Sequence, residues 1–284
     1  MGSRLRRNNV ARIGRIVTFI VIFAFGIFMA LPLIYSILQS LKPFDELFIY
    51  PPKFFPKRPS FDNYVDLFSI TSNSWVPFSR YIFNSVWVTV VSTVLQILAA
   101  CMAAYPLALH EFPGKKLMNN IIVWSLLFNA TVTALPAFIV LAKLNLIDNP
   151  LGLIIPTIGS SFALFLMINF MVTISPALLE AARIDGATEF QTLWKVAFPM
   201  VKPAYMTLAI FAFQGCWNSV GATPIYTEVM KLLPTALSQI MAAGNARVGA
   251  SAASQVILMI PPIVFFIIAQ SNTVETMSHA GIKG

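Results

Sequence analysis

Long apolar runs, separated by shorter polar segments, dominate the chain. Six of them approach or exceed the roughly 20 residues that an α-helix needs to cross a bilayer. They cover residues 16–40, 81–109, 118–142, 151–174, 204–223 and 254–272. Apolar and polar positions do not alternate within a run, which favours helices over the strands of a membrane barrel. The pattern predicts an all-α integral membrane protein with about six transmembrane helices.

The polar segments predict the connections between these helices. Residues 41–80 are too long and too rich in proline for a simple turn, and prolines favour extended chain. The stretch FDNYVDLF at 61–68 then predicts a short helix along a membrane surface. The connection 224–253 is rich in small residues, which fits a mobile loop, although a plain solvated connection is the other interpretation.

Composition and charge narrow the class further. Hydrophobic residues make up 57% of the 284 residues and charged residues 11%, whereas soluble domains carry about 25% charged residues. The net charge of +8 does not indicate a nucleic-acid partner, because five arginines precede the first run, where basic residues favour the cytoplasmic side. We expect residues 1–15 to be a cytoplasmic N-terminal segment and 16–284 a transmembrane domain. The cysteines and histidines stand isolated, so no disulfide or metal site is expected.

One polar stretch, EAARIDGATEFQTLWKVAFPMVKP at 180–203, carries six charged residues. A charged side chain costs about 2.5–3.5 kcal/mol at the centre of a bilayer, so this stretch must lie in water. If the N-terminus is cytoplasmic, the alternation of the runs places the connection 175–203 in the cytoplasm and 224–253 outside.

The same connection predicts two helices joined by a turn. Residues 175–184 begin with a serine cap and a proline that suits a first turn. Asp185-Gly186 indicates a break, and Thr188 with Gln191 fits a capping box that opens a second helix. That helix is expected to end at the prolines 199 and 203. The alanines and glycine around the break leave a nearly bare surface that suits the docking of a partner.

The order of these residues resembles the cytoplasmic EAA loop of ABC importer permeases. Glutamate, paired alanines, Asp-Gly-Ala and two downstream prolines all keep the family's order between two apolar runs. The resemblance is strongest to carbohydrate-uptake permeases, similar to the smaller membrane subunit of the maltose importer. Further similar segments are LKP (41–43), FDNYVDLF (61–68), FNSVWVT (83–89), AAYPLA (103–108), FPGKK (112–116), NLIDNPLGLIIP (145–156), LPTAL (233–237) and GIKG (281–284). The tail over 274–280 departs from the family's pattern.

This resemblance implies a type I ABC importer permease fold, whose cytoplasmic coupling helix sits in a cleft of an ATPase. The residues that match the coupling positions are Glu180, Ala181, Ala182, Asp185, Gly186 and Ala187, with Gly186 at the closest approach. The chain has no G-x-x-x-x-G-K-[ST] motif, so it is expected not to be an enzyme and to carry no cofactor. ATP and magnesium would be bound by separate ATPase subunits.

The resemblance also implies a set of partners and a location. These are a second permease subunit, two ATPase subunits, an extracellular or periplasmic solute-binding protein and a sugar or oligosaccharide as cargo. The complex would lie in the cell (inner) membrane of a bacterium or archaeon. The outer connection 224–253 would reach the binding protein.

Polar residues inside the runs are candidates for the translocation path. They are Asn84, Asn129, Gln214, Trp217 and Asn218, with Gln96 and Asn169 as weaker ones. Amides also join membrane helices by hydrogen bonds worth about 0.6 kcal/mol on average, so packing is the competing interpretation. The Trp217 ring can stack on a sugar or can anchor its helix at an interface.

Two other functions stay open from the sequence. An ABC importer permease for a non-sugar solute would keep the same loop. An ion-coupled secondary carrier would usually place ionisable residues at mid-membrane, where none is obvious in this chain.

Overall fold

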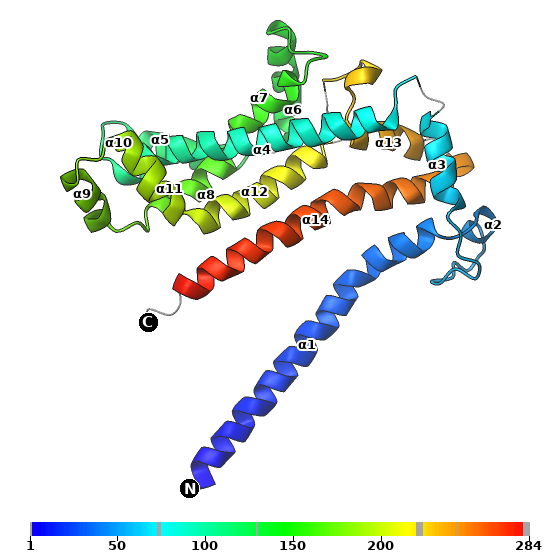
Figure 1. Ribbon diagram of the computed structural model, residues 1–284, viewed down its shortest axis with the longest axis horizontal. Helices are drawn as coiled ribbons and strands as arrows, with labels where there is room; N and C mark the ends of the chain where they lie inside the picture. The colour runs from blue at the N-terminus through cyan, green and yellow to red at the C-terminus, as the bar shows by residue number, and fades with distance from the viewer. Residues whose placement is uncertain (1, 73–74, 129, 220–223, 243, 281–284) are drawn as a thin grey trace. The chain divides into compact units, whose positions relative to one another are not determined.

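The computed structural model describes residues 2–72, 75–128, 130–219, 224–242 and 244–280, and these contain helices and turns but no strand (Figure 1). Four helices are long: α1 (Gly2–Ser40), α4 (Phe78–Leu109), α12 (Lys202–Trp217) and α14 (Val248–Ala280). The shorter helices are α2 (Phe44–Leu47), α3 (Asp62–Ser72), α5 (Lys115–Ser125), α6 (Ala130–Lys143), α7 (Leu151–Ile158), α8 (Ser161–Met171), α9 (Pro176–Ile184), α10 (Glu189–Thr192), α11 (Phe198–Met200) and α13 (Leu233–Met241). The short helix predicted at 61–68 is present as α3.

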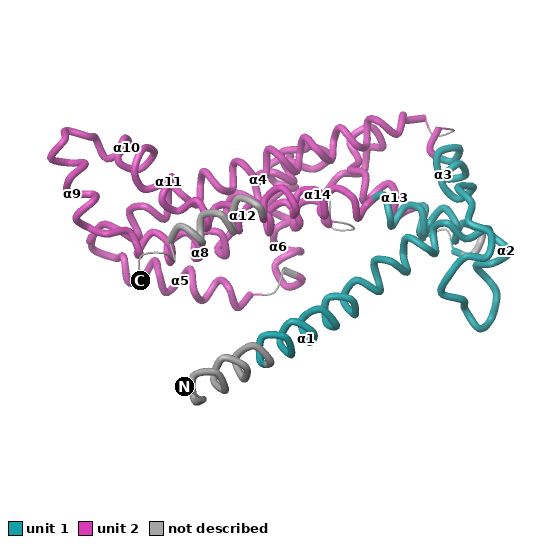
Figure 2. Tube along the Cα trace, turned by 60° about the horizontal axis from the view of Figure 1, so that its bottom comes forward, with its two compact units in different colours: residues 1–70, 240–257 teal, residues 71–239, 258–284 magenta. Residues whose placement is uncertain are grey.

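The chain forms two compact units (Figure 2). Unit 1 comprises residues 1–70 and 240–257, and unit 2 comprises residues 71–239 and 258–284. The boundaries fall inside α3, α13 and α14.

The described residues contain several helices that are long and apolar enough to cross a membrane. They are Gly14–Ser40, Phe78–Leu109, Leu151–Met171 and Val248–Gln270. A fifth span exists if Glu189–Met200 and Lys202–Trp217, which meet at a bend of 78°, are counted together. The protein is therefore a multi-pass membrane protein, as the apolar runs predict.

The third apolar run, at 118–142, differs from its prediction of a single helix. It is divided between α5, which ends at Ser125, and α6, whose apolar part Thr131–Lys143 is too short to cross a bilayer. After Ser125, the amides of residues 126–128 each donate to the carbonyl three residues back. Such a tight turn is a common way for a helix to end.

Small side chains on α4 allow neighbouring helices to pack closely and form the core of unit 2. This helix packs against α7, α8 and α12 (Figure 1). Ala100 and Ala104 of α4 are buried in one cluster with Met167 of α8 and Leu208 of α12. Small residues let neighbouring membrane helices approach closely, so the alanine-rich stretch at 97–108 determines which face of α4 meets its neighbours.

In unit 1, one asparagine joins three segments. The buried Asn63 side chain on α3 donates from Nδ2 to the carbonyl oxygens of Ser40 and Lys42, each at 2.7 Å. Its Oδ1 lies where a side chain at Gly249 would begin, since a Cβ added there would be 2.0 Å away. The first turn of α14 can therefore approach α3 only with glycine at this position.

We expect Gly249→Ala to destabilise unit 1 by about 1–3 kcal/mol, the usual cost of overpacking. Asn63 cannot move aside without losing two hydrogen bonds. Thermal unfolding of the purified chain in detergent measures the effect. Gly26→Ala is the matched control, because that glycine is also helical and a Cβ there meets nothing within 4 Å. Equal unfolding temperatures for the two variants would contradict the prediction.

Candidate functional site

The connection 175–203 forms the two helices and the turn that its sequence predicts. Ser175 precedes α9 and Pro176 occupies its first position, although the serine side chain makes no capping hydrogen bond. Gly186 has a φ of +81°, a left-handed conformation that glycine adopts without a steric cost. The capping box opens α10: the Gln191 amide donates to Thr188 Oγ1 at 3.3 Å, and the Thr188 amide donates to Gln191 Oε1 at 2.9 Å.

The second helix of this connection ends at Met200, between the two prolines at which its end is predicted. A π-helical turn over Leu193–Ala197 follows α10, and the Phe198 amide donates to the Leu193 carbonyl five residues back. The widened turn accommodates Pro199, which has no amide hydrogen to give to the carbonyl four residues back. The helix therefore runs through Pro199 to Met200. Pro203 lies in the first turn of α12, where a missing amide hydrogen costs little.

The residues predicted to couple to an ATPase lie on the surface of this connection. Glu180, Ala181, Asp185 and Gly186 are exposed, and Ala182 and Ala187 are half-buried. A Cβ added at Gly186 would meet no atom within 4 Å. Two large apolar side chains accompany them, Ile184 at 84% exposed and Phe190 at 66% exposed. Open small residues beside exposed apolar ones form a surface suited to a protein partner.

A cluster of four side chains, here called the tether, fixes this connection to the end of α4. Glu189 accepts hydrogen bonds from Tyr105 Oη at 2.7 Å and from Arg183 Nε at 3.1 Å. Arg183 Nη2 lies 3.0 Å from the same carboxylate, and His110 Nε2 lies 3.4 Å from it. Tyr105 is buried in the core cluster of unit 2, so movement of the exposed loop is linked to a packed membrane helix.

Sequence reasoning did not identify the tether. In the sequence, Arg183 and Glu189 stand out only as charges that keep the stretch in water, and His110 only as an isolated histidine. The sequence feature that could have indicated the tether is Tyr105. Its hydroxyl lies near the end of an apolar run, on the same predicted side of the membrane as the connection 175–203.

At the other end of α4, residues 224–233 form what we call the outer platform, a name that refers to the side of the membrane predicted for it. Tyr81 Oη donates to Glu228 Oε1 at 2.8 Å, and the Leu233 amide donates to Ser85 Oγ at 2.6 Å. The buried Lys231 also pairs with Glu228. Burial raises the pKa of the Glu228 carboxyl, but the hydrogen bonds from Lys231 and Tyr81 outweigh it and leave the pKa below its ordinary value.

Asp148 holds the start of the outer platform from the connection between α6 and α7. Its Oδ1 accepts from the amides of Tyr226 at 2.6 Å and Thr227 at 2.7 Å, and its Oδ2 accepts from the Thr227 hydroxyl at 2.7 Å. Hydrogen bonds from Thr227, and then from the Tyr226 amide, lower the pKa of Asp148. The described part of the connection 224–253 is thus attached at several points, contrary to a mobile loop.

Acid should release this attachment. Since the pKa of Asp148 is lower in the folded protein, the stabilisation is complete above the ordinary aspartate pKa of about 3.9 and is lost as pH falls through the folded value. We expect proteolysis or hydrogen exchange of residues 224–227 to increase below about pH 4. In Asp148→Asn the same increase should be absent, because the amide does not titrate. An identical acid response in both proteins would argue against this role.

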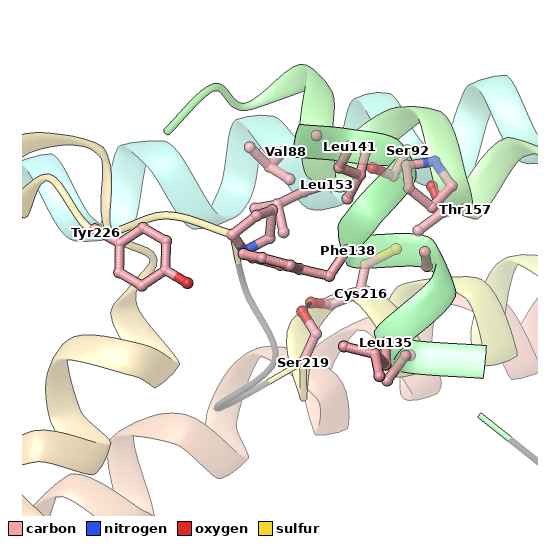
Figure 3. A pocket seen from close by; sticks show the side chains of 16 residues that line it. Val88, Ser92, Leu135, Phe138, Leu141, Leu153, Thr157, Cys216, Ser219 and Tyr226 are labelled. Atoms are coloured by element: carbon pink, nitrogen blue, oxygen red, sulfur yellow. Dashed lines mark hydrogen bonds between the residues drawn. The ribbon is translucent and has the colours of Figure 1, made fainter. Parts of the chain in front are cut away.

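A cavity of about 480 Å³ lies between the outer platform and helices α4, α6, α7 and α12 (Figure 3). Its wall is mainly apolar, with Phe138 and Tyr226 among its rings. Ser92, Thr157 and Ser219 also line it. The hydroxyls of Thr157 and Ser219 donate to the carbonyls of Ile154 and Cys216, at 2.6 and 2.7 Å. Of the predicted path residues that the structure describes, none is among those that line this cavity.

Comparisons with known proteins bear on the identity of this arrangement. No family model matches the chain. A solved bacterial ABC transporter that imports the acidic polysaccharide alginate matches with a TM-score of 0.76 and 26% identity, over 92% of this chain and 96% of that one. Another alginate ABC transporter, in complex with an alginate pentasaccharide-bound periplasmic protein, shares the fold at a TM-score of 0.58 and 16% identity over 91% of each chain.

Curated relatives decide the family. The arabinooligosaccharides transport system permease protein AraQ of Halalkalibacterium halodurans is 28% identical over 267 residues, covering 92% of this chain and 94% of that protein. The trehalose transport system permease protein SugB of Mycobacterium tuberculosis is 30% identical over 260 residues, covering 89% and 92%. The chain belongs to the family of sugar ABC transport system permeases. The fold and the family predicted from the sequence are thereby confirmed.

In the structure of the permease, two of the predicted path residues have packing roles. The Trp217 side chain is 2% exposed, donates from Nε1 to the Leu258 carbonyl at 3.1 Å and stacks on Phe213. The Asn84 amide donates to the carbonyls of Val229 and Lys231, at 2.8 and 3.1 Å, and so supports the outer platform.

The other candidates differ in accessibility. Gln214 is half-buried on α12, and Asn218 is exposed just after this helix ends. Asn129 lies outside the described residues. A role in the translocation path stays a prediction for all of them.

Proposed function

We propose that the permease is the transmembrane subunit of an ATP-driven importer for a sugar or oligosaccharide, and that its connection 175–203 couples it to separate ATPase subunits. The observation that carries the proposal is the exposed turn at Gly186, joined through the tether to the buried Tyr105 of α4. An uncovered small-residue surface receives a partner, and a hydrogen-bonded link to a core helix transmits its movement.

The coupling surface is assigned to the six residues around the turn. They are Glu180, Ala181, Ala182, Asp185, Gly186 and Ala187, and the assignment is supported by the exposure of the four that are not alanines 182 and 187. Ile184 and Phe190 extend the surface with apolar area that would be buried on docking. The exposed Glu180 and Asp185 carboxylates would lie at its rim and orient the partner.

The permease itself is proposed to perform no catalysis. Two ATPase subunits would bind ATP and magnesium, and a second permease would complete the membrane domain. The outer platform offers a fixed surface to an extracellular or periplasmic binding protein. The alginate transporter solved with its periplasmic protein supports a partner of this kind.

A sugar or oligosaccharide is the proposed cargo because the relatives handle chemically similar solutes. They are named for arabinooligosaccharides and trehalose, and the solved structure is named for alginate. Among the predicted path residues Asn218 is exposed and Gln214 is half-buried, while Asn84 and Trp217 would support the path from behind. The N-terminus and the connection 175–203 are assigned to the cytoplasm of a bacterial or archaeal cell.

Co-purification tests the proposal. The tagged permease should retain an ATPase, a second permease and a binding protein, and the reconstituted complex should take up the oligosaccharide that this binding protein holds only when ATP is supplied inside. Uptake by the purified chain alone, driven by a proton or sodium gradient, would overturn the proposal in favour of a secondary carrier. ATP-dependent uptake of a solute that is not a sugar would overturn only the proposed identity of the cargo.

A further inference from the structure

The segment that follows α1, residues 41–60, turns back along the end of that helix, and we call it the return loop. The Ser60 amide donates to the Leu41 carbonyl at 2.9 Å, which closes the loop at its base. The buried Lys42 ammonium donates to Gln39 Oε1 at 2.8 Å and to the Lys53 carbonyl, which fixes the middle of the loop. All of these residues belong to unit 1.

Aromatic contacts place the tip of the return loop beside α1, not beyond its end. The Phe54 ring lies 5.6 Å from the Tyr35 ring, and Lys42 Nζ lies 5.5 Å from the same ring. Tyr35 precedes the last residue of the helix by five positions, so Phe54 lies about 8 Å back along the axis.

The length of the span gives the depth of that contact. Gly14–Ser40 contains 27 residues and is therefore about 40 Å long, close to the thickness of a bilayer with its headgroups. If the uncharged stretch between Arg15 and Lys42 is centred along the bilayer normal, Ser40 would lie at the outer limit of the headgroups and Tyr35 near the boundary with the acyl chains. Because Phe54 contacts Tyr35, the tip of the return loop would lie at this boundary too.

The side chains at the tip suit that depth. Phe55 packs on Phe54 at 5.2 Å between ring centroids, yet it remains 69% exposed. Lys53 and Lys57 are exposed on either side of this pair. Rings that enter the acyl boundary beside cations that remain at the phosphates are typical of an interfacial segment.

We propose that the return loop is a lipid-binding anchor, in which Phe54 and Phe55 enter the boundary of the acyl chains while Lys53 and Lys57 contact lipid phosphates. Its occupant is the bilayer leaflet at the Ser40 end of α1. Continuity with the membrane-facing end of α1 favours lipid over a protein, because Leu33, Ile34 and Ile37 on the same turns are exposed.

A spin label at position 55 tests the proposal. The full chain carrying Phe55→Cys is labelled with a nitroxide and reconstituted into liposomes of phosphatidylethanolamine and phosphatidylglycerol. Collision with oxygen, which concentrates in lipid, is compared with collision with a water-soluble nickel chelate. Asp62→Cys, at an exposed charged position in the first turn of α3, is the matched control, and the wild-type protein, whose two cysteines are buried, gives the background labelling.

We expect oxygen collisions to exceed nickel collisions severalfold at position 55, and the order to be reversed at position 62. Brominated lipids should reduce the emission of a bimane label at position 55 and leave one at position 62 unchanged. Two results would overturn the proposal. Nickel accessibility at 55 equal to that at 62 would place the tip in water, and exclusion of both reagents would mean that protein covers it.

Discussion

Replacement of Gly186 by tryptophan is expected to leave the permease folded in the membrane and to reduce ATP-dependent uptake at least about tenfold, equivalent to about 1.4 kcal/mol of lost interaction. The new side chain would project from the turn where a Cβ meets no atom of the described chain, so it does not disturb the fold by overlap. It would occupy the surface proposed to enter the ATPase. Uptake into proteoliposomes and ATP hydrolysis stimulated by the loaded binding protein measure the loss.

Two control variants separate the effect of side-chain volume at position 186 from the effect of backbone strain. Gly186→Ala keeps the strain of a left-handed conformation, about 1–2 kcal/mol, but adds little volume, so uptake should fall far less. Gly114→Trp is the matched variant elsewhere, since Gly114 is exposed, has a φ of +91° and also has no atom within 4 Å of an added Cβ. Normal uptake and stimulated hydrolysis in Gly186→Trp would contradict the coupling assignment. So would an equal loss in Gly114→Trp.

Loss of the tether is expected to lower the amount of solute imported per ATP without releasing the ATPase subunits. In Glu189→Gln the ion pair with Arg183 disappears and the hydrogen bond from Tyr105 weakens. The carboxylate is half exposed, so we assign the change about 1 kcal/mol, or roughly fivefold in coupled transport. The ratio of uptake to hydrolysis in proteoliposomes is the measurement.

Two further variants show whether the link or mere folding is responsible. Tyr105→Phe removes only the hydroxyl and should reproduce part of the loss with the same thermal stability. The exchange Arg183→Glu with Glu189→Arg restores the ion pair in reverse and should recover part of the ratio. An unchanged ratio of uptake to hydrolysis in Glu189→Gln would show that the tether does not transmit movement.

The coupling loop could be predicted in detail because its signals are local. The capping box needs only Thr188 and the residue three positions later, and the break needs only a glycine where the chain reverses. The loop's exposure follows from its charges, which cannot remain in lipid. The π-helical turn escaped prediction because Pro199 is compatible with either an end or a widened turn, and packing of the buried Ala197 favours continuation.

The contacts that hold the site together could not be predicted, since they join residues far apart in the chain. Tyr105 and Glu189 are 84 positions apart, and Tyr81 and Glu228 are 147 apart. The same limitation explains the outer platform, where small residues suggested mobility and remote partners provide attachment. It also explains why a single helix is wrongly predicted for the third apolar run. Hydropathy gives the length of an apolar run but does not reveal the turn after Ser125.

If the connection 175–203 couples to an ATPase as proposed, the bend of 78° between residues 189–200 and α12 sets the direction in which its movement reaches the membrane helices. The joint at Val201 is buried, so the two arms change direction without a loose hinge between them. A movement along the axis of the first arm would therefore act on the second arm almost at right angles to its axis. Such a lever would tilt the Lys202 end of α12 sideways, where a straight rod would push it along the helix axis.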